Sequence, residues 1–213
     1  MPAPPPLTII HAADRYVVVD KASGFLSVPG KGPDKQDSVA TRIRAAFPAA
    51  TGPLTVHRLD MDTSGLLVFG LDEDAQRDLS RQFEERRVEK TYAAIVEGAM
   101  PGERGLFDAP MRLDVDNRPV QVIDFAQGRP AQTEWRVIRP EPGGRTRLEL
   151  TPRTGRTHQL RLHMAHLGTP IVGDVLYGCG TSDAARLMLH ASSLGFNRPG
   201  TQDRVHYVSE PPF

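Results

Sequence analysis

Two carboxylates lie close together in a short polar stretch, residues 57–65. The stretch reads His-Arg-Leu-Asp-Met-Asp-Thr-Ser-Gly, with Asp60 and Asp62 near its centre and Gly65 at its end. The apolar residues of 54–59 and 66–71 predict two short strands around it, the second buried on both faces. A charged loop between two buried strands combines a rigid base with a reactive tip, and we therefore expect catalytic groups here.

The carboxylates alone admit two interpretations. Asp60-Met61-Asp62-Thr63 resembles the start of the haloacid-dehalogenase phosphatase signature, Asp-x-Asp-x-Thr/Val, in which the first Asp attacks phosphorus and magnesium is required. The fit is imperfect, because Ser64 occupies the last signature position and two strand-like runs and a helix precede the stretch. The other interpretation is structural, an Asp that caps a turn through hydrogen bonds to the backbone.

A longer string resembles the catalytic motif of the RluA-type pseudouridine synthases: His57-Arg58-Leu59-Asp60-x-x-Thr63-Ser64-Gly65. Seven specified residues in a nine-residue window favour this interpretation over a lone turn-capping Asp. The resemblance implies that Asp60 is the nucleophile and that Arg58 fills the space left by a flipped base. The motif positions of His57 and Thr63 are further expected contacts to RNA.

A second motif of the same family is matched by Lys90-Thr-Tyr92, a hydrophobic run and Glu97-Gly98. The resemblance implies that the ring of Tyr92 stacks on the target base and that its hydroxyl assists removal of a proton. Residues 88–98 also read as a strand, and a strand tyrosine packed in the core is the structural alternative.

The third motif is Thr154-Gly-Arg-Thr-His-Gln-Leu-Arg161, which resembles the family's Gly-Arg-x-His-Gln-[Leu/Ile]-Arg. The resemblance implies that Arg156 pairs with the catalytic aspartate, and a guanidinium favours the ionised form of a desolvated carboxylate. The motif positions His158, Gln159 and Arg161 are expected to contact RNA. Thr157 is expected to cap the helix that follows.

An arginine-rich stretch surrounds the third motif. From Arg129 to Arg161 there are eight arginines and three acidic residues, although the whole chain balances 26 Lys and Arg against 26 Asp and Glu. This excess predicts a surface that contacts phosphates, with Arg129 among its members; scattered surface arginines are the alternative. A non-catalytic RNA-binding protein would keep this surface and tolerate the loss of Asp60.

Length and composition limit the remaining possibilities. The chain has 213 residues, enough for one sizeable core, and we expect a flexible lead over residues 1–6 and a single catalytic domain over 7–213. A single cysteine, Cys179, excludes an intramolecular disulfide and is read as a small loop residue. No apolar run reaches membrane length and no signal peptide is seen, so we expect a soluble, cytoplasmic protein. We also expect a monomer.

Periodicity predicts the other elements. Ser38 or Asp37 is expected to cap a helix with Val39, Ile43 and Phe47 inward, and a second helix should run from about residue 72 to Arg86. Residues 101–110 are read as a loop and 120–125 with 133–138 as a probable hairpin. The remaining elements are strands at 7–10, 16–20, 145–150, 187–196 and 205–208, and a helix after Thr157.

The resemblance covers nearly the whole chain and implies an α+β fold, a mixed, mainly antiparallel sheet with a central active-site cleft flanked by helices. It implies isomerisation of uridine to pseudouridine within RNA, without metal or other cofactor, by a covalent or a glycal route. The pair His163 and His166 could bind a metal, but no further ligands lie nearby in the sequence. The short form, without an additional N-terminal RNA-binding domain, is most similar to members that modify a 23S rRNA hairpin, a tRNA anticodon stem-loop, or both.

Overall fold

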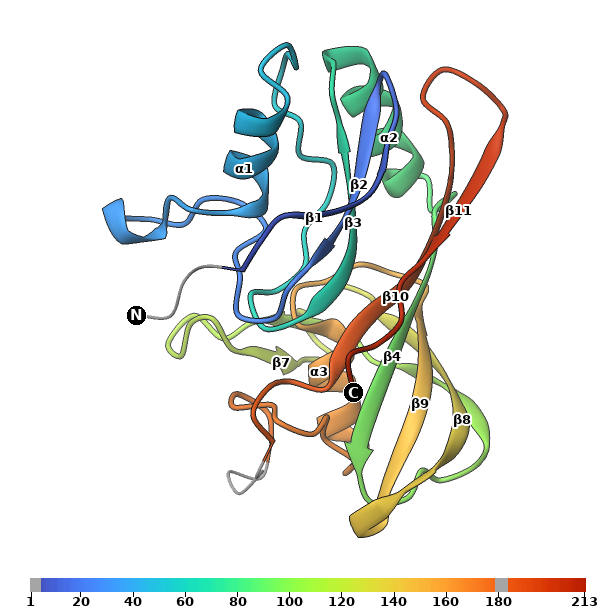
Figure 1. Cartoon of the computed structure of the whole chain (residues 1–213). Helices are drawn as coiled ribbons and strands as arrows, with labels where there is room; N and C mark the ends of the chain where they lie inside the picture. The colour runs from blue at the N-terminus through green and yellow to red at the C-terminus, as the bar shows by residue number, and fades with distance from the viewer. Residues whose placement is uncertain (1–4, 179–183) are drawn as a thin grey trace. The chain divides into compact units, whose positions relative to one another are not determined.

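The computed structural model of the chain describes residues 5–178 and 184–213 (Figure 1). Cys179 and the first four residues of the expected lead lie outside the described residues. The chain divides into two compact units, the first formed by residues up to Lys90 with Ala191–Pro212, the second by Thr91–His190 with Phe213. The single domain expected from the sequence stays a prediction.

The first unit is built on a sheet. Its strands are β1 (Thr8–Ala12), β2 (Tyr16–Lys21), β3 (Ser64–Gly70), the part of β10 (Leu189–Asn197) that starts at Ala191, and β11 (Arg204–Val208). They lie in the order β1-β2-β3-β10-β11, and the pairs β1–β2, β2–β3 and β10–β11 are antiparallel. β3 is therefore an inner strand, and all of its residues are buried.

Two helices flank this sheet, α1 (Val39–Ala46) and α2 (Glu73–Glu84), and a short 3-10 helix spans Pro33–Lys35 (Figure 1). Leu79 of α2 packs with Val18 and Val68 on one face of the sheet. Val17 and Phe69, which point to the other face, are fully buried as well. The sheet is thus covered on both faces, and this explains its continuous apolar runs.

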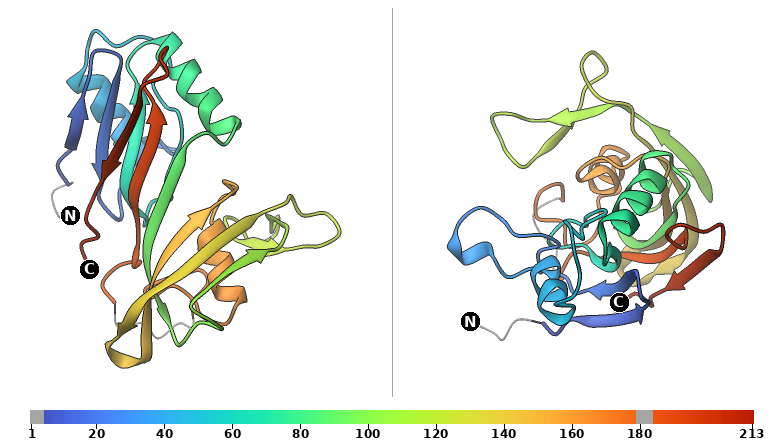
Figure 2. Two further views of the ribbon diagram at one scale, coloured as in Figure 1. Left: turned by 90° about the vertical axis from the view of Figure 1, so that its right-hand side faces the viewer. Right: turned by 90° about the horizontal axis from the view of Figure 1, so that it is seen from above.

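The second unit combines a sheet with one helix. Its elements are β4 (Glu89–Glu97, from Thr91 on), β5 (Arg104–Asp108), β6 (Met111–Leu113), β7 (Gln121–Ile123), β8 (Gln132–Glu141), a 3-10 helix (Pro142–Gly144), β9 (Arg145–Pro152) and α3 (Gln159–His166). The order β4-β9-β8-β5 is antiparallel throughout, and β6 pairs with β7. Helix α3 lies beside this sheet (Figure 2), and its Leu160 and Met164 share a buried cluster with Leu148 and Leu150 of β9.

Most predicted elements are confirmed, together with the α+β class. Ser38 caps α1 in a capping box with Thr41, and Asp72 caps α2. Val39, Ile43, Leu79, Leu160 and Met164 are buried as their spacing predicted. Within the described residues, no helix is long and apolar enough to span a membrane.

Three predictions about local structure are wrong. Residues 54–59 do not form a strand: Leu54 has a φ of 59°, and only an isolated bridge joins Thr55 to Phe69. Residues 101–110 contain β5, whose partner is β8. The expected hairpin of 120–125 with 133–138 does not form, because β7 pairs with β6.

The expected cap of the third helix is also wrong. His158, not Thr157, occupies the N-cap position of α3, with a φ of 55° and no side-chain hydrogen bond to the helix. A left-handed residue at this position turns the chain sharply from the motif loop into the helix.

Candidate active site

Asp60 lies on an irregular loop that leads into β3. Asp60 and Asp62 are half-buried. Met61, which lies between them, and Arg58, two residues before Asp60, are exposed. Leu59 is buried and anchors the loop in the first unit. The loop therefore combines a buried anchor with charged side chains that are partly or fully exposed.

His57 anchors the beginning of this loop. Its ring stacks on Phe83 of α2 at a centroid distance of 4.3 Å, and its Nε2 accepts a hydrogen bond of 3.2 Å from the Val68 N–H. Burial, and secondarily the positive charge of Lys90, lower the pKa of His57 to about 3. The imidazole is thus neutral at physiological pH, and its contacts within the protein support a structural role for this motif residue.

Thr63 is the other expected RNA contact in this loop. Its side chain is 2% exposed, and its Oγ1 has no hydrogen-bond partner within the part of the chain that the structure describes. A buried hydroxyl without a partner costs free energy, so its retention in the motif calls for an explanation, and a role in the site is one.

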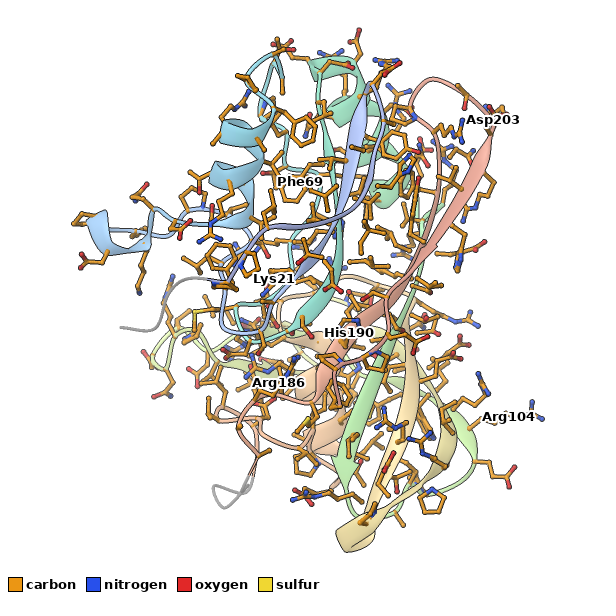
Figure 3. All side chains as sticks on the ribbon, in the orientation of Figure 1. Lys21, Phe69, Arg104, Arg186, His190 and Asp203 are labelled. Atoms are coloured by element: carbon orange, nitrogen blue, oxygen red, sulfur yellow. The ribbon has the colours of Figure 1, made fainter. Side chains whose placement is uncertain are left out.

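Three residues that were not predicted as part of the site hold the backbone of the loop from outside. Lys21, Ser23 and Ser27 all direct their side chains to backbone carbonyls between Leu59 and Asp62. Lys21, whose position is labelled in Figure 3, is almost completely buried, at 1% exposed. A lysine at the end of an apolar strand is the only signal that could have indicated it, because a serine bonded to a distant backbone leaves no pattern.

Arg156, from the third motif, belongs to the second unit and is held by Gln159. The Arg156 N–H donates to Gln159 Oε1 at 3.1 Å, and the Gln159 N–H donates to the Arg156 carbonyl at 3.2 Å. The guanidinium Nε donates to the carbonyl of Pro130 at 3.1 Å. Gln159 is 3% exposed, and its amide also donates to Thr133 Oγ1 at 3.0 Å. Gln159 is therefore placed to position Arg156.

The two remaining residues of the third motif are also buried. Arg161 pairs with Asp174 and is 2% exposed, which speaks against a direct contact with RNA. His158 Nδ1 lies 2.9 Å from the hydroxyl of Tyr177 and is turned inward by its left-handed backbone. Their contacts support a role in building the start of α3 and the loop that follows it.

Tyr92 and Arg129 occupy different places in the second unit. Tyr92 lies on β4 opposite Leu150, half-buried against the apolar cluster of this unit. Arg129 is exposed, and its backbone bonds to Met111 in both directions at 2.9 and 3.0 Å. The exposed guanidinium on a fixed backbone is compatible with the predicted contact to RNA phosphate.

The arginine-rich stretch is largely neutralised within the protein. At least six of its eight arginines form ion pairs: Arg136 with Glu149, Arg139 and Arg147 with Glu141, Arg145 with Glu97, Arg153 with Glu134, and Arg161 with Asp174. This pairing weakens the interpretation of the whole stretch as a phosphate-binding surface.

Comparison with known proteins decides the family. The profile of the RNA pseudouridylate synthase family matches residues 15–166, more than two thirds of the chain. The chain belongs to this family. It is 44% identical to the dual-specificity RNA pseudouridine synthase RluA of Pasteurella multocida, over 100% of this chain and 96% of that protein. It is 45% identical to the protein of the same name from Escherichia coli K12, over 93% of this chain and 90% of that protein.

A solved structure shows the same fold. Human RNA pseudouridylate synthase domain containing 1 is 32% identical with a TM-score of 0.80, covering 98% of this chain and 84% of that one. The protein is thus an RNA pseudouridine synthase, an isomerase with an α+β pseudouridine synthase fold. The phosphatase and the non-catalytic interpretations are not favoured.

Within residues 5–178 and 184–213, no group of three or more His, Cys, Asp or Glu side chains is arranged to hold a metal ion. His163, one member of the histidine pair considered from the sequence, uses both ring nitrogens inside the protein. Its Nδ1 lies 2.9 Å from Thr133 Oγ1, and its Nε2 lies 3.2 Å from the Ala109 carbonyl.

Proposed function

We propose that this pseudouridine synthase acts through Asp60 on uridines in both an rRNA hairpin and a tRNA anticodon stem-loop. The observation that carries the assignment of Asp60 is its place in the loop: it is half-buried between Leu59, which is buried, and Met61, which is exposed. The dual substrate is supported by 44% identity, over almost the full length, to relatives named dual-specificity synthases.

The chemistry needs one carboxylate. The bond between uracil N1 and the ribose C1′ breaks, the uracil turns, and a bond forms between C5 and C1′. The C5 hydrogen leaves as a proton and N1 gains one, so the atoms and electrons balance without an oxidant or reductant. An ionised Asp60 supports the departure of the uracil, as carboxylates do in glycosidases.

Other residues keep the roles expected from their motifs. Tyr92 and Arg156 are assigned to the base and to the ionised carboxylate, respectively, and Arg58 to the space that the flipped uridine leaves. Extruding a uridine costs a few kcal/mol, which contacts of this kind must offset. We further propose that the protein works as a monomer in the cytoplasm, where rRNA and tRNA are found.

Tritium release from RNA labelled at uracil C5 tests this function. The substrates are a 23S rRNA hairpin and a tRNA anticodon stem-loop, both unmodified, with EDTA present. The wild type is expected to release tritium from both, and Asp60→Asn from neither while still binding RNA. Asp62→Asn is the matched control, because Asp62 lies in the same loop and is half-buried too; it is expected to stay active.

Three outcomes would contradict the proposal. Tritium release by Asp60→Asn would show that Asp60 is not the nucleophile. Release from only one of the two RNAs would contradict the dual specificity. Magnesium-dependent release of phosphate by the wild type, lost in both Asp60→Asn and Asp62→Asn, together with no tritium release from either RNA, would favour the phosphatase-like use of both carboxylates.

A further inference from the structure

The backbone on both sides of Asp60 is tied to a separate segment, residues 21–27. Three carbonyls accept hydrogen bonds from its side chains. Ser27 Oγ donates to the Leu59 carbonyl at 2.7 Å, Lys21 Nζ to the Met61 carbonyl at 2.7 Å, and Ser23 Oγ to the Asp62 carbonyl at 2.6 Å. Asp60 thus lies between anchored neighbours.

Ser27 makes two hydrogen bonds with the backbone of the loop. Its Oγ also accepts a hydrogen bond of 3.1 Å from the Leu59 N–H, so one hydroxyl satisfies both backbone groups of the residue that precedes Asp60. Ser27 is 3% exposed. A buried irregular backbone must find such partners, since it has no neighbouring strand to supply them. Ser27 therefore supplies to Leu59 the hydrogen bonds that a neighbouring strand would supply to a residue of a sheet.

Lys21 ties the segment to the loop from the other side of Asp60. It ends β2 opposite Gly65, and its buried ammonium donates to the carbonyls of Ala22, Phe25 and Met61 at 2.9, 2.7 and 2.7 Å. A buried ammonium is costly unless its hydrogens are bonded, so these contacts are retained once formed. The Lys21 ammonium therefore bonds to two carbonyls within the segment and to the carbonyl of Met61 in the loop.

The segment itself is fixed at its far end. The N–H groups of Val39 and Ala40, at the start of α1, donate to the carbonyls of Leu26 and Ser27 at 2.9 and 3.1 Å. The segment is therefore held by β2 through Lys21 and by α1 through Ser27. It can transmit the rigidity of both elements to the loop.

We propose that Lys21, Ser23 and Ser27 are positioning residues of the synthase, which set the place of the Asp60 carboxylate through the backbone around it. The inference rests on the proposed role of Asp60 as nucleophile. A nucleophile displaced by about 1 Å can lose 100-fold in rate. Because the three side chains bond to backbone carbonyls within the protein, their loss should slow the chemical step and leave the affinity for RNA unchanged.

Ser27→Ala tests the proposal, with Thr146→Val as the matched control. Thr146 Oγ1 also donates to a backbone carbonyl, that of Gly98, at 2.7 Å, and Thr146 is also buried. The readouts are single-turnover tritium release, the Kd for the stem-loop and the thermal unfolding midpoint. Ser27→Ala should be about 10- to 100-fold slower with Kd within about twofold of the wild type, and Thr146→Val should match the wild type in both.

A Ser27→Ala rate within twofold of the wild type would overturn the proposal, and so would a Kd that weakens as much as the rate. If Ser27→Ala does not fold, Ser23→Ala decides, since Ser23 is only half-buried; it should also slow release without changing Kd, and a normal rate would overturn the proposal. A wild type without release would contradict the proposed function itself, whereas an active wild type with unaffected variants would contradict the positioning role alone.

Discussion

The guanidinium of Arg161 forms two hydrogen bonds of 2.7 Å with the carboxylate of Asp174, and both side chains are almost completely buried. The Asp174 Oδ1 also accepts hydrogen bonds from the N–H groups of Leu176 and Tyr177. The pair thus joins helix α3, which begins within the third motif, to the loop of residues 174–177.

Asp174→Ala should strongly destabilise the protein. Removing one partner leaves a buried guanidinium without its carboxylate, and such changes cost about 3–5 kcal/mol. Urea unfolding at neutral pH measures the loss. Glu149→Ala is the control, because the Glu149 pair with Arg136 is 37% and 59% exposed, and exposed pairs contribute about 0–1 kcal/mol. Equal losses in the two variants would contradict the structural role of the buried pair.

Gly65, at the end of the first motif, should not tolerate a side chain. Its φ is 112°, and an added Cβ would collide with the backbone of Ala191 on β10. Gly98 has a φ of 79° but open space around it, so Gly98→Ala carries only the backbone strain. We expect about 1–3 kcal/mol for Gly98→Ala and clearly more for Gly65→Ala.

Chemical denaturation of both glycine variants separates the two effects. A larger loss for Gly65→Ala would show that the close approach of β10 is what requires glycine in the motif. A similar loss for the two variants would mean that the left-handed backbone alone requires it.

The sequence predicts best where burial is continuous. β2 and β3 are buried on both faces, so their valine- and leucine-rich runs locate them well. β5 was missed because it contains Gly105 and its apolar residues, Leu106 and Phe107, are adjacent rather than alternating. The residues before Asp60 were misread for the opposite reason: apolar anchors such as Leu59 occur in irregular loops as well as in strands.

The motifs located the candidate residues, but not what holds them. The arginine-rich stretch looked like a phosphate surface, whereas Arg145 finds its partner Glu97 48 residues away. Likewise, Ser27 and Leu59 are 32 residues apart. Such long-range polar pairs follow from the tertiary fold, and no local pattern of charge or hydroxyl groups predicts them.

Because His163 is buried in its neutral form, the free energy of unfolding should be smaller in mild acid than at neutral pH. Its Nε2–H donates to Ala109, so its Nδ1 must accept from the Thr133 hydroxyl, which in turn accepts from Gln159. Burial lowers the pKa of His163 to about 4, against about 6.5 in the unfolded chain. Its contribution to stability is complete above pH 6.5 and is lost as the pH falls towards 4, because only the unfolded chain binds the proton in this range.

Unfolding free energies between pH 7 and pH 4 measure this effect. The contribution of His163 should reach at most about 3 kcal/mol. His57, whose pKa is also lowered, acts in the same direction and persists in the variant. His163→Gln should therefore show a smaller loss on acidification than the wild type. Parallel pH dependences would show that His163 titrates normally.

Arg58→Ala should slow catalysis without changing stability. Arg58 is exposed on the Asp60 loop, and surface substitutions of this kind change the free energy of unfolding by about 0.5 kcal/mol or less. If Arg58 fills the space left by the flipped uridine, its contacts offset part of the few kcal/mol that unstacking costs. Without Arg58 this part is added to the activation barrier, and turnover should fall about 10- to 100-fold. Tritium release from a stem-loop measures it.

Arg104→Ala is the matched control for Arg58, since Arg104 is an exposed arginine on β5 (Figure 3). A second substrate sharpens the comparison. An RNA in which the target uridine lies in an unpaired, flexible strand needs less unstacking, so Arg58→Ala should lose less activity on it than on the stem-loop. An equal loss on both RNAs would indicate that Arg58 acts by binding phosphate, and an unchanged rate on the stem-loop would remove its role altogether.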